Sequence, residues 1–338
     1  MSTARLIHGV AESTVQRDRD RLDQAIATLF FNFLGAHSVV LFHVHEAEGE
    51  RRVSRRAGVS EGGVMLGAAA VEEPASLPKL ADNPPWAECV DADRVVEAWG
   101  PEGRLTTAFP LHARGEILGI LIVESENSLP VAHIDLLHGI LRIVENHLAL
   151  LDYGERDTLT GLLNRKTFEN RFEKTRDRLA PVDGSSAAPV GSYLALVDID
   201  RFKSINDSHG HLFGDEVLLL VSQLMKHNFR GADQLFRFGG EEFVIVLEQA
   251  TEAGARIAFE RFRTAIETHT FPQVGRVTIS LGYTRITARD VTTTSVERAD
   301  GALYYAKSHG RNLCCNYEAL VAAGELTPKA EQVDAELF

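Results

Sequence analysis

The chain has 338 residues, of which 48 are acidic and 35 basic, so its formal net charge is −13. This excess of negative charge argues against nonspecific binding to nucleic acid or to anionic membranes, and no apolar run reaches the length of a membrane span. The three cysteines, Cys89, Cys314 and Cys315, lack the spacing of a metal site and suit a reducing compartment, so we expect a cytoplasmic protein of two domains.

The first 130 residues are predicted to form an α+β domain. A helix is expected over residues 15–35, where apolar side chains recur on one face. Strands are expected over residues 39–44 and 51–57, and the two can pair with each other. Residues 74–103 are rich in Pro, Asp and Glu, a composition typical of long loops with short helices.

A hairpin with its turn at residues 114–116 is predicted near the end of this domain. Its pattern, Pro110-Leu followed by Gly115-Glu-Ile-Leu-Gly119, resembles the late hairpin of GAF sensor domains. A PAS domain or a divergent module is the alternative. The resemblance implies that the domain receives a signal from an unknown small molecule or protein.

Residues 131–155 are predicted to form a signalling helix that links the two domains. Its apolar residues are spaced three and four apart, which is typical of a coiled-coil seam. The seam consists of Ile134, Leu137, Leu141, Val144, Leu148 and Leu151. A single amphipathic helix that packs on its own sensor domain would show the same stripe. The spacing alone leaves both interpretations open.

Two acidic strand ends follow in the second half of the chain. A strand expected over residues 193–200 is apolar until Asp198, and burying such a charge without a partner is costly, so a cation or water-filled site is implied. The second end is the turn Gly239-Gly-Glu-Glu242, which precedes the apolar run 243–247. Adjacent glycines permit a turn with positive φ and leave the backbone bare, which suits a divalent cation carrying a phosphate. An ordinary acidic hairpin turn is the alternative.

Three polar residues lie between these strand ends. Lys203 can neutralise phosphate oxygens as a point charge. Asn206 offers a donor and an acceptor and Asp215 offers acceptors only, a combination that matches the edge of guanine. A helix is expected over residues 216–229, so Asp215 is alternatively a helix-start residue favoured by the macrodipole.

Four motifs occur here in the order found in GGDEF-domain diguanylate cyclases, and over residues 155–318 the chain resembles that family. The motifs are Asp157-Thr-Leu-Thr-Gly-Leu-Leu-Asn-Arg165, Asp198-Ile-Asp-Arg-Phe-Lys203, Gly239-Gly-Glu-Glu-Phe243 and Tyr304-Tyr-Ala-Lys-Ser-His-Gly-Arg-Asn312. Glu241 stands where the family signature has Asp, and it keeps the carboxylate. The resemblance implies a central, mostly antiparallel sheet flanked by helices, similar to nucleotide cyclases and polymerase palms. It also implies that two GTP molecules condense into cyclic di-GMP with release of two pyrophosphates.

The resemblance also assigns roles to individual residues. Mg²⁺, with Mn²⁺ as an alternative, is expected on Asp198, the Ile199 carbonyl, Glu241 and Glu242. Glu242 is a further metal ligand or the base that activates the 3′-hydroxyl, and catalytic roles are expected for Glu241, Glu242 and Lys203. Substrate contacts are expected from Phe202, Lys203, Asn206, Asp215, Gly239, Gly240, Lys307 and Arg311. Because converging carboxylates would repel an anionic nucleotide, the metal is required in this interpretation.

A second nucleotide site is indicated just before the signature. Arg230-x-x-Asp233 is followed by five residues and then Gly239, which is the spacing of the family's inhibitory site. Arginine can bind phosphate or a guanine edge through its planar fork, and aspartate accepts from guanine amino groups. Arg261 is the expected third member. The alternative is a helix-end arginine with a turn aspartate, but the resemblance favours binding of cyclic di-GMP as an inhibitor.

We therefore predict a dimeric, sensor-controlled and Mg²⁺-dependent diguanylate cyclase. The predicted domains are residues 1–130, 131–155 and 156–318, followed by an acidic tail at 319–338. Because the reaction needs two facing half-sites, we favour a homodimer through the Ile134–Leu151 helix. A non-catalytic cyclic di-GMP receptor and a cyclase with relaxed base choice are the alternatives. The intact acidic residues argue against a receptor, and Asn206 with Asp215 favours guanine.

Overall fold

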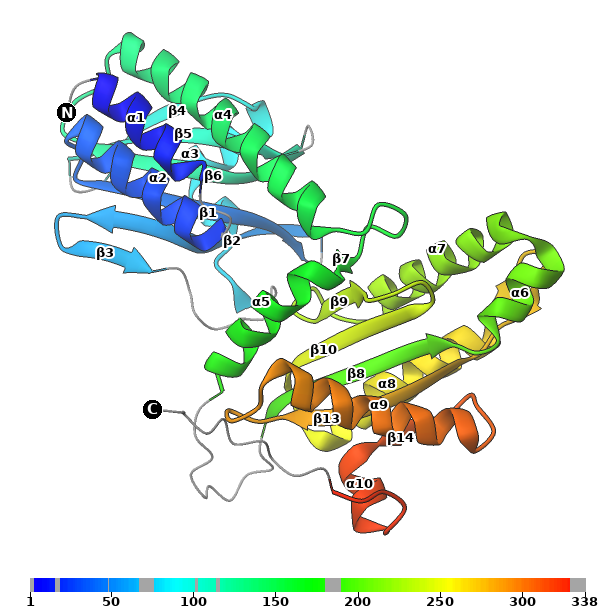
Figure 1. The fold of residues 1–338 in the computed structure, drawn as a ribbon. Helices are drawn as coiled ribbons and strands as arrows, with labels where there is room; N and C mark the ends of the chain where they lie inside the picture. Colours follow the sequence, from blue (N-terminus) through cyan, green and yellow to red (C-terminus); the bar gives the residue numbers. More distant parts are fainter. Residues whose placement is uncertain are drawn as a thin grey trace. The chain divides into compact units, whose positions relative to one another are not determined.

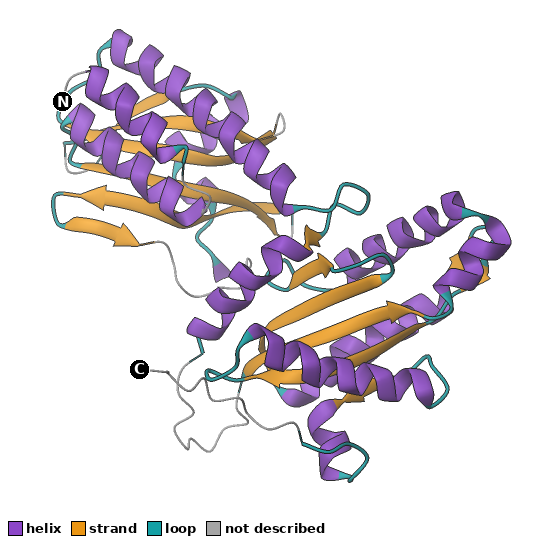
Figure 2. Ribbon diagram, in the orientation of Figure 1, coloured by secondary structure: helices purple, strands orange, loops and turns teal. Residues whose placement is uncertain are grey.

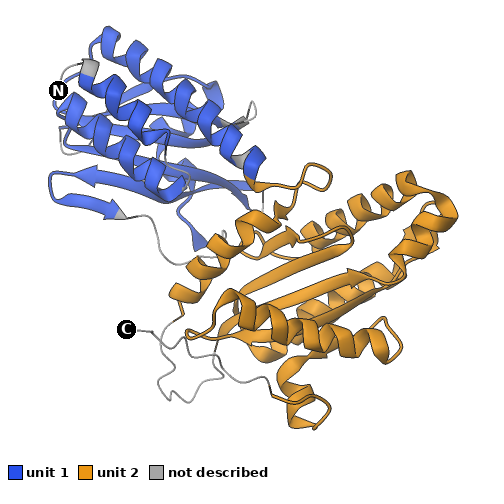
Figure 3. Cartoon of the chain, viewed as in Figure 1, with its two compact units in different colours: residues 1–154 blue, residues 155–338 orange. Residues whose placement is uncertain are grey.

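The computed structural model (Figure 1) describes residues 3–15, 19–47, 49–66, 76–100, 103–113, 116–179 and 190–328. The chain divides into two compact units, residues 1–154 and 155–338, which Figure 3 colours separately. Two of the predicted hairpin turn residues, 114 and 115, and residues 329–338 of the predicted tail lie outside the described part. None of the described helices combines the length and the apolar character that crossing a bilayer requires.

The first unit is a six-stranded antiparallel sheet with helices on both faces (Figure 1, Figure 2). The strand order is β3-β2-β1-β6-β5-β4. The strands are β1 Ser38–Ala47, β2 Glu50–Ser60, β3 Gly63–Leu66, β4 Val96–Trp99, β5 Leu105–Ala113 and β6 Glu116–Ser125. One face is covered by α1 (Thr3–Ser13), α2 (Arg19–Leu34) and α4 (Val131–Glu155), the other by η2 (Leu80–Asp82) and α3 (Pro84–Ala92).

Alternating apolar residues give this sheet its two faces. In β6, Leu121 and Val123 pack toward α1, α2 and α4, whereas Ile120 and Ile122 pack toward α3. β1 and β2 pair antiparallel, which confirms the two strands predicted at the start of the domain. The predicted first helix begins later than expected, at Arg19, and α1 precedes it. What the structure shows is a sheet-rich domain, and its resemblance to GAF domains stays a prediction.

The apolar stripe of α4 corrects the predicted dimer contact. Leu137, Leu141 and Val144 are buried in the core that α1 and α2 share with the sheet. Ile134, Leu148 and Leu151 are partly buried and pack against the same core. The seam is therefore covered by its own unit. Of the two interpretations, a coiled coil and a helix that packs on its own domain, the structure supports the second. A spacing of three and four residues marks any helix face that is buried, whichever chain covers it.

The second unit has a six-stranded mixed sheet in the order β14-β13-β8-β10-β9-β7 and a small β11-β12 ribbon. The strands are β7 Leu163–Asn164, β8 Gly191–Ile199, β9 Gln234–Arg237, β10 Glu242–Ala250, β11 Thr270–Phe271, β12 Gly275–Arg276, β13 Ile279–Ile286 and β14 Cys314–Asn316. The helices are α5 Arg165–Asp177, α6 Phe202–His209, α7 His211–Asn228, α8 Glu252–Thr268, α9 Thr292–Ser308 and α10 Tyr317–Ala322. The predicted tail thus begins inside α10.

The central strand β8 is buried along its whole length and separates two cores. Tyr193, Ala195 and Val197 pack with α7 and α8, while Leu194 and Leu196 pack with α5 and α9. β8 pairs antiparallel with β10 and β13, and only the outer pairs β13-β14 and β7-β9 are parallel. The predicted central, mostly antiparallel sheet flanked by helices is therefore confirmed for this unit, and its centre ends at Asp198 and Ile199.

Close contact between β13 and α9 depends on Gly282. A Cβ atom there would lie 2.0 Å from the backbone nitrogen of Leu303 and 2.2 Å from the carbonyl oxygen of Ala299. Both neighbours are helix backbone, so neither can move aside without displacing α9, which carries Lys307 toward the strand ends.

We predict that Gly282→Ala lowers the free energy of unfolding by about 3 kcal/mol, because the added methyl group overpacks a rigid contact. Urea unfolding followed by circular dichroism measures this loss. Gly301→Ala is the matched control, since a Cβ at this α9 position meets only Leu326 Cδ1 at 3.9 Å. Equal stability of the two variants would contradict the assigned packing.

Candidate active site

The register of the second sheet brings the acidic residues together. Glu242, the first residue of β10, lies directly opposite Asp198 in the pairing with β8. Ser280 of β13 lies opposite Asp198 on the other side. The N–H of Ile199 donates to the carbonyl oxygen of Glu241 over 3.3 Å. The signature turn therefore folds over the end of β8, as expected from the two acidic strand ends.

Lys307 of α9 reaches into this acidic group. Its Nζ atom lies 2.7 Å from Oδ2 of Asp198, whose side chain is only 8% exposed. The resemblance predicted a phosphate contact for Lys307, whereas in this structure its partner is a carboxylate. Because the Lys307 ammonium group occupies the position beside Asp198, this position favours a positive charge.

Crowded carboxylates give the site its electrostatic character. Burial raises the pKa of Asp198, the contact with Lys307 opposes that shift, and the charges of Glu242 and Asp200 add to it. Burial also raises the pKa of Glu241, and the nearby charge of Asp198 raises it further against the opposing charge of Lys307. Each acid makes it harder for its neighbours to ionise. A divalent cation would relieve this repulsion, and oxygen ligands are those that Mg²⁺ and Mn²⁺ prefer. In the described part of the chain, however, no group of three or more Asp, Glu, His or Cys side chains is already arranged as a metal site.

The two glycines of the signature have different environments. A Cβ atom on Gly239 would lie 2.7 Å from Oε2 of Glu242, so a side chain there would push the glutamate aside. Gly240 has no atom within 4 Å of that position, which leaves its backbone open. Neither glycine has a positive φ, so the expected left-handed turn is not what requires them. Glycine is required at position 239 because a side chain would collide with Glu242, and glycine at position 240 leaves the backbone uncovered.

A brace connects the signature turn to the start of the unit. Nη1 of Arg237 lies 3.0 Å from Oδ1 of Asp157, while Nη2 donates to the carbonyl oxygen of Gly240 over 2.9 Å. Burial alone would raise the pKa of Asp157, but hydrogen bonds from Thr160 and Arg237 bring it below its ordinary value. Asp157 is the first residue of a recognised motif, whereas no role was predicted for Arg237, which lies two residues before the signature.

The predicted phosphate-binding residues follow β8 through one left-handed residue. Arg201 has φ 58°, and α6 begins at Phe202. The Phe202 side chain is buried, so only its backbone can face a ligand, whereas Lys203 is exposed. The backbone N–H of Phe202 and the ammonium group of Lys203 thus follow the end of β8 directly, and their contacts with phosphates stay a prediction.

The predicted guanine-reading residues belong to two helices that touch. Asn206 of α6 packs so closely on α7 that a Cβ atom on Gly214 would lie 2.0 Å from its Oδ1 atom. Asp215 is the next residue and is exposed. α7 begins at His211, five residues earlier than predicted, so Asp215 lies beyond the first turn. The macrodipole explanation for Asp215 is thereby weakened, because that effect is confined to the first turn.

Asp200 is a buried residue whose role the sequence did not reveal. Its Oδ1 atom accepts from Ser280 Oγ over 2.7 Å, and Oδ2 accepts from Thr278 Oγ1 over 2.8 Å. Oδ2 also accepts from the backbone N–H of Asn312 over 3.0 Å. Arg311 and Asn312 have φ 65° and 49°, so this loop is held in an unfavourable backbone conformation. Asp200 therefore positions the loop that carries Arg311. In the sequence, only its position two residues after Asp198 indicated that it could belong to the site.

The predicted inhibitory residues lie close to one another at the end of α7. The N–H of Arg230 donates to Oδ2 of Asp233 over 2.9 Å, and burial raises the pKa of Asp233 against such backbone hydrogen bonds. Nη2 of Arg261 on α8 donates to the carbonyl oxygen of Asn228. A groove of about 520 Å³ that includes Arg261 runs along α8. The fold thus brings the three predicted residues to one surface region.

The chain is similar in sequence to known diguanylate cyclases. The sequence model described as "Diguanylate cyclase, GGDEF domain" matches residues 155–313. The chain is 31% identical over 265 residues to diguanylate cyclase DgcZ of Escherichia coli K12, covering 72% of this chain and 85% of that protein. It is 40% identical over 159 residues to diguanylate cyclase DgcP of Pseudomonas aeruginosa, covering 46% of this chain and 23% of that protein. The coiled coil and GGDEF domain of DgcB from Caulobacter crescentus, solved with c-di-GMP, gives a TM-score of 0.48 at 25% identity and covers 56% of this chain and 100% of that one.

We predict that Asp200→Asn lowers the free energy of unfolding by about 2 kcal/mol, because an amide nitrogen cannot accept the hydrogen bonds that the carboxylate accepts. The amide hydrogen of Asn312 should exchange faster with solvent, as mass spectrometry of exchanged peptides would report. Asp207→Asn, at an exposed position of α6, is the control. Unchanged exchange at Asn312 would rule out the positioning role of Asp200.

Proposed function

The chain belongs to the GGDEF family of diguanylate cyclases, and on that premise we propose that its active site is the strand-end cluster of Asp198, Glu241 and Glu242. The reaction joins two GTP molecules: the 3′-hydroxyl of each attacks the α-phosphate of the other, and pyrophosphate leaves. The observation that carries the assignment is the β8–β10 register, which places Glu242 directly opposite Asp198.

Asp198 and Glu241 would hold a divalent cation, Mg²⁺ or Mn²⁺, with the Ile199 carbonyl and Glu242 beside them. When bound, such a cation neutralises phosphate oxygens and makes a nearby hydroxyl a better nucleophile. Glu242 is the third carboxylate, and it can accept the proton of the attacking 3′-hydroxyl. Lys307 would exchange its contact with Asp198 for a phosphate oxygen, since the cation would then balance the carboxylates.

The nucleotide itself would be held by groups on three elements. Lys203 and the backbone at Phe202 would contact the phosphates, and Arg311 would reach them from the loop that Asp200 holds. Asn206 and Asp215 would pair with the guanine edge, because together they offer the acceptors that its N1–H and amino group require. Gly240 leaves room for the phosphates to approach the backbone. Catalysis in this arrangement comes from positioning and charge neutralisation.

We predict that Glu241→Ala lowers the rate of cyclic di-GMP formation about a hundredfold or more, because the cation loses a ligand. Incubation with GTP and Mg²⁺ followed by chromatography measures the product and separates a cyclase from a receptor or from an enzyme of relaxed base choice. Mg²⁺ should raise the melting temperature of the unaltered protein but not of the variant. Glu169→Ala, an exposed change on α5, is the control, and full activity of Glu241→Ala would refute the site.

Product inhibition is proposed for Arg230, Asp233 and Arg261. The support is their common location at the end of α7 and the adjoining groove on α8. Two arginines and one carboxylate match the phosphates and the guanine amino group of cyclic di-GMP. Binding there would lie outside the strand-end cluster, so inhibition and catalysis can be separated by mutation.

We predict that Arg230→Ala leaves the initial rate unchanged and raises the cyclic di-GMP concentration needed for half inhibition about tenfold, since one charge-assisted contact is lost. Initial rates measured with added product test this. Arg289→Ala, in an exposed loop, serves as the control. Equal inhibition of the two variants would remove the inhibitory assignment.

Dimer formation is proposed through a different face of α4 from the predicted one. Each cyclase unit would hold one GTP, so two copies of the chain have to meet. Ile143, Leu150 and Tyr153 are 52%, 69% and 69% exposed, and they lie on the side of α4 opposite to its buried stripe. Their spacing of seven and three residues lets two copies pack side by side along this face. The domain ahead of α4 would then control the cyclase through this helix.

We predict that Leu150→Glu shifts the protein from dimer to monomer and reduces cyclase activity in parallel, because a charge would be buried in the contact. Light scattering after size-exclusion chromatography gives the mass. Val131→Glu is the matched control, since Val131 is 73% exposed at the opposite end of the same helix, far along its axis from Leu150. A dimer that survives Leu150→Glu would exclude this surface.

A further inference from the structure

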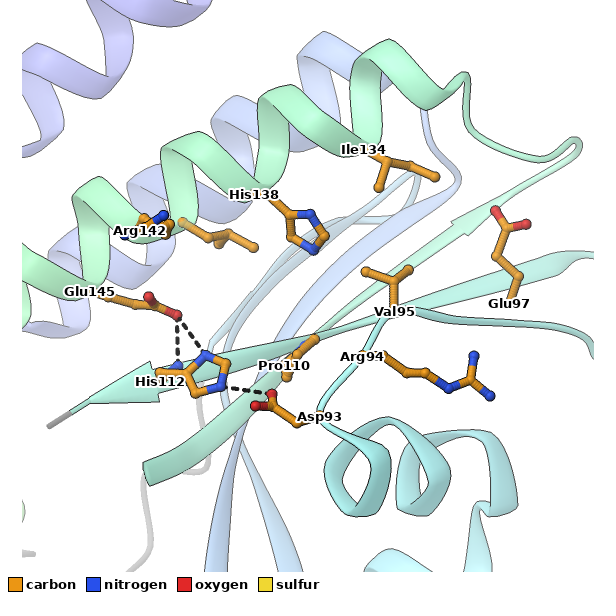
Figure 4. A pocket seen from close by; sticks show the side chains of 11 residues that line it. Asp93, Arg94, Val95, Glu97, Pro110, His112, Ile134, His138, Arg142 and Glu145 are labelled. Atoms are coloured by element: carbon orange, nitrogen blue, oxygen red, sulfur yellow. Dashed lines mark hydrogen bonds and ion pairs between the residues drawn. The ribbon is translucent and has the colours of Figure 1, made fainter. Parts of the chain in front are cut away.

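A pocket of about 930 Å³ lies in the first unit between α4 and the strands β4 and β5 (Figure 4). Its apolar floor includes Pro110 of β5 with Ile134 and Leu141 of α4. Its volume lies in the range of pockets that bind small molecules. Because one wall is α4, whatever fills the pocket touches the helix that continues into the cyclase unit.

One end of the pocket is closed by His112, which links three elements. Its Nε2 atom lies 2.8 Å from Oδ1 of Asp93, and its Nδ1 atom lies 3.4 Å from Oε1 of Glu145 on α4. The backbone N–H of His112 also donates to Oε1 of Glu145 over 2.7 Å. Figure 4 shows these contacts on one side of the pocket. The carboxylates of Asp93 and Glu145 therefore both interact with His112.

The third acid of the pocket has its donors as well. The Ser128 hydroxyl donates to Glu97 Oε2 over 2.9 Å, and the Thr107 hydroxyl donates to Oε1 over 3.3 Å. Each acid that lines the pocket therefore has at least one hydrogen-bond donor or cationic partner from the protein.

Two donor side chains of the pocket wall remain uncommitted. His138 and Arg142 are one helical turn apart on α4, so their side chains lie on the same face. Within the described residues the Arg142 guanidinium makes no hydrogen bond or ion pair, and His138 has only an edge contact with the Phe109 ring. Both side chains can donate hydrogen bonds to an acceptor group of a ligand. A carboxylate is such an acceptor, and its two oxygens match the planar fork of the arginine guanidinium.

We propose that this pocket binds a small organic acid with an apolar body, whose carboxylate contacts Arg142 and His138 and whose body covers Pro110, Ile134 and Leu141. The acid would be the signal of the first unit, an inference that rests on the sensor role proposed above. Its binding, however, does not depend on that role. Occupying the pocket joins α4 to β5 through the ligand, in addition to the His112 contacts.

Calorimetric titration of the full chain tests this with acetate, hexanoate, phenylacetate and indole-3-acetate as ligands. At least one of the larger acids is expected to bind, and acetate, which lacks the apolar body, should bind more weakly. Phenethylamine, which pairs the ring of phenylacetate with an ammonium group, should not bind. Arg142→Ala should weaken binding about tenfold, the effect of one charge-assisted hydrogen bond. Arg5→Ala, an exposed change on α1, should leave it unaltered.

Three results would overturn the proposal: no binding by any acid, equal binding of the amine, or unchanged binding by Arg142→Ala. Because Arg142 is exposed, the variant is expected to fold, and circular dichroism verifies this. The titration needs no GTP turnover. Failure of the cyclase assignment would therefore leave this result intact, and failure here would leave the cyclase site intact.

Discussion

One end of the sheet in the second unit is dominated by repulsion among carboxylates, because the pairing register of its strands places these groups side by side. β8 and β10 pair so that Asp198 and Glu242 are direct neighbours, with Glu241 one residue away. Burial and mutual repulsion raise the pKa of Asp198 and of Glu241, which is costly for a folded protein. Lys307 offsets part of this cost through its contact with Asp198. Added positive charge would relieve the remaining repulsion, and we propose that a divalent cation supplies it.

Two braces keep this cluster in place. Arg237 joins Asp157 to the carbonyl of Gly240, so the signature turn is anchored to the first residues of the unit. Asp200 joins β13 to the loop of Arg311 and Asn312 by accepting three hydrogen bonds. Rigid support of this kind is what nucleotidyl transfer requires, since the reaction asks for groups held in position rather than for covalent chemistry.

Features whose chemistry is local to a short motif could be predicted from the sequence. The acidic strand ends and the bare backbone of Gly240 follow from short patterns of charge, glycine and apolar runs, whereas the central sheet was implied by the resemblance to the family. Asp200 and Arg237 were missed because their roles depend on partners about 80 to 112 positions away, which pairing of strands alone brings close. The start of α7 was placed too late because Gly210 and Gly214 favour a turn locally, while packing of α6 on α7 favours the helix.

The apolar stripe of α4 shows a different limit. The same spacing describes a face buried by a second copy and a face buried by the sheet of its own chain. Only the structure distinguishes them, and it assigns Leu137, Leu141 and Val144 to their own core. The opposite face of α4 is exposed, and it is the surface that we propose for contact with a partner copy. The flank of the helix lines the pocket of the first unit.

The central claim is that Asp198, Glu241 and Glu242 are assembled to hold a cation for a nucleotide. The most direct measurement is anomalous X-ray scattering from a crystal grown with Mn²⁺ and a non-reacting GTP analogue. Our account predicts a manganese ion bonded to Asp198 and Glu241, with the Lys307 ammonium moved from Asp198 to a phosphate oxygen. A manganese ion bound elsewhere, with the contact between Lys307 and Asp198 intact, would contradict it.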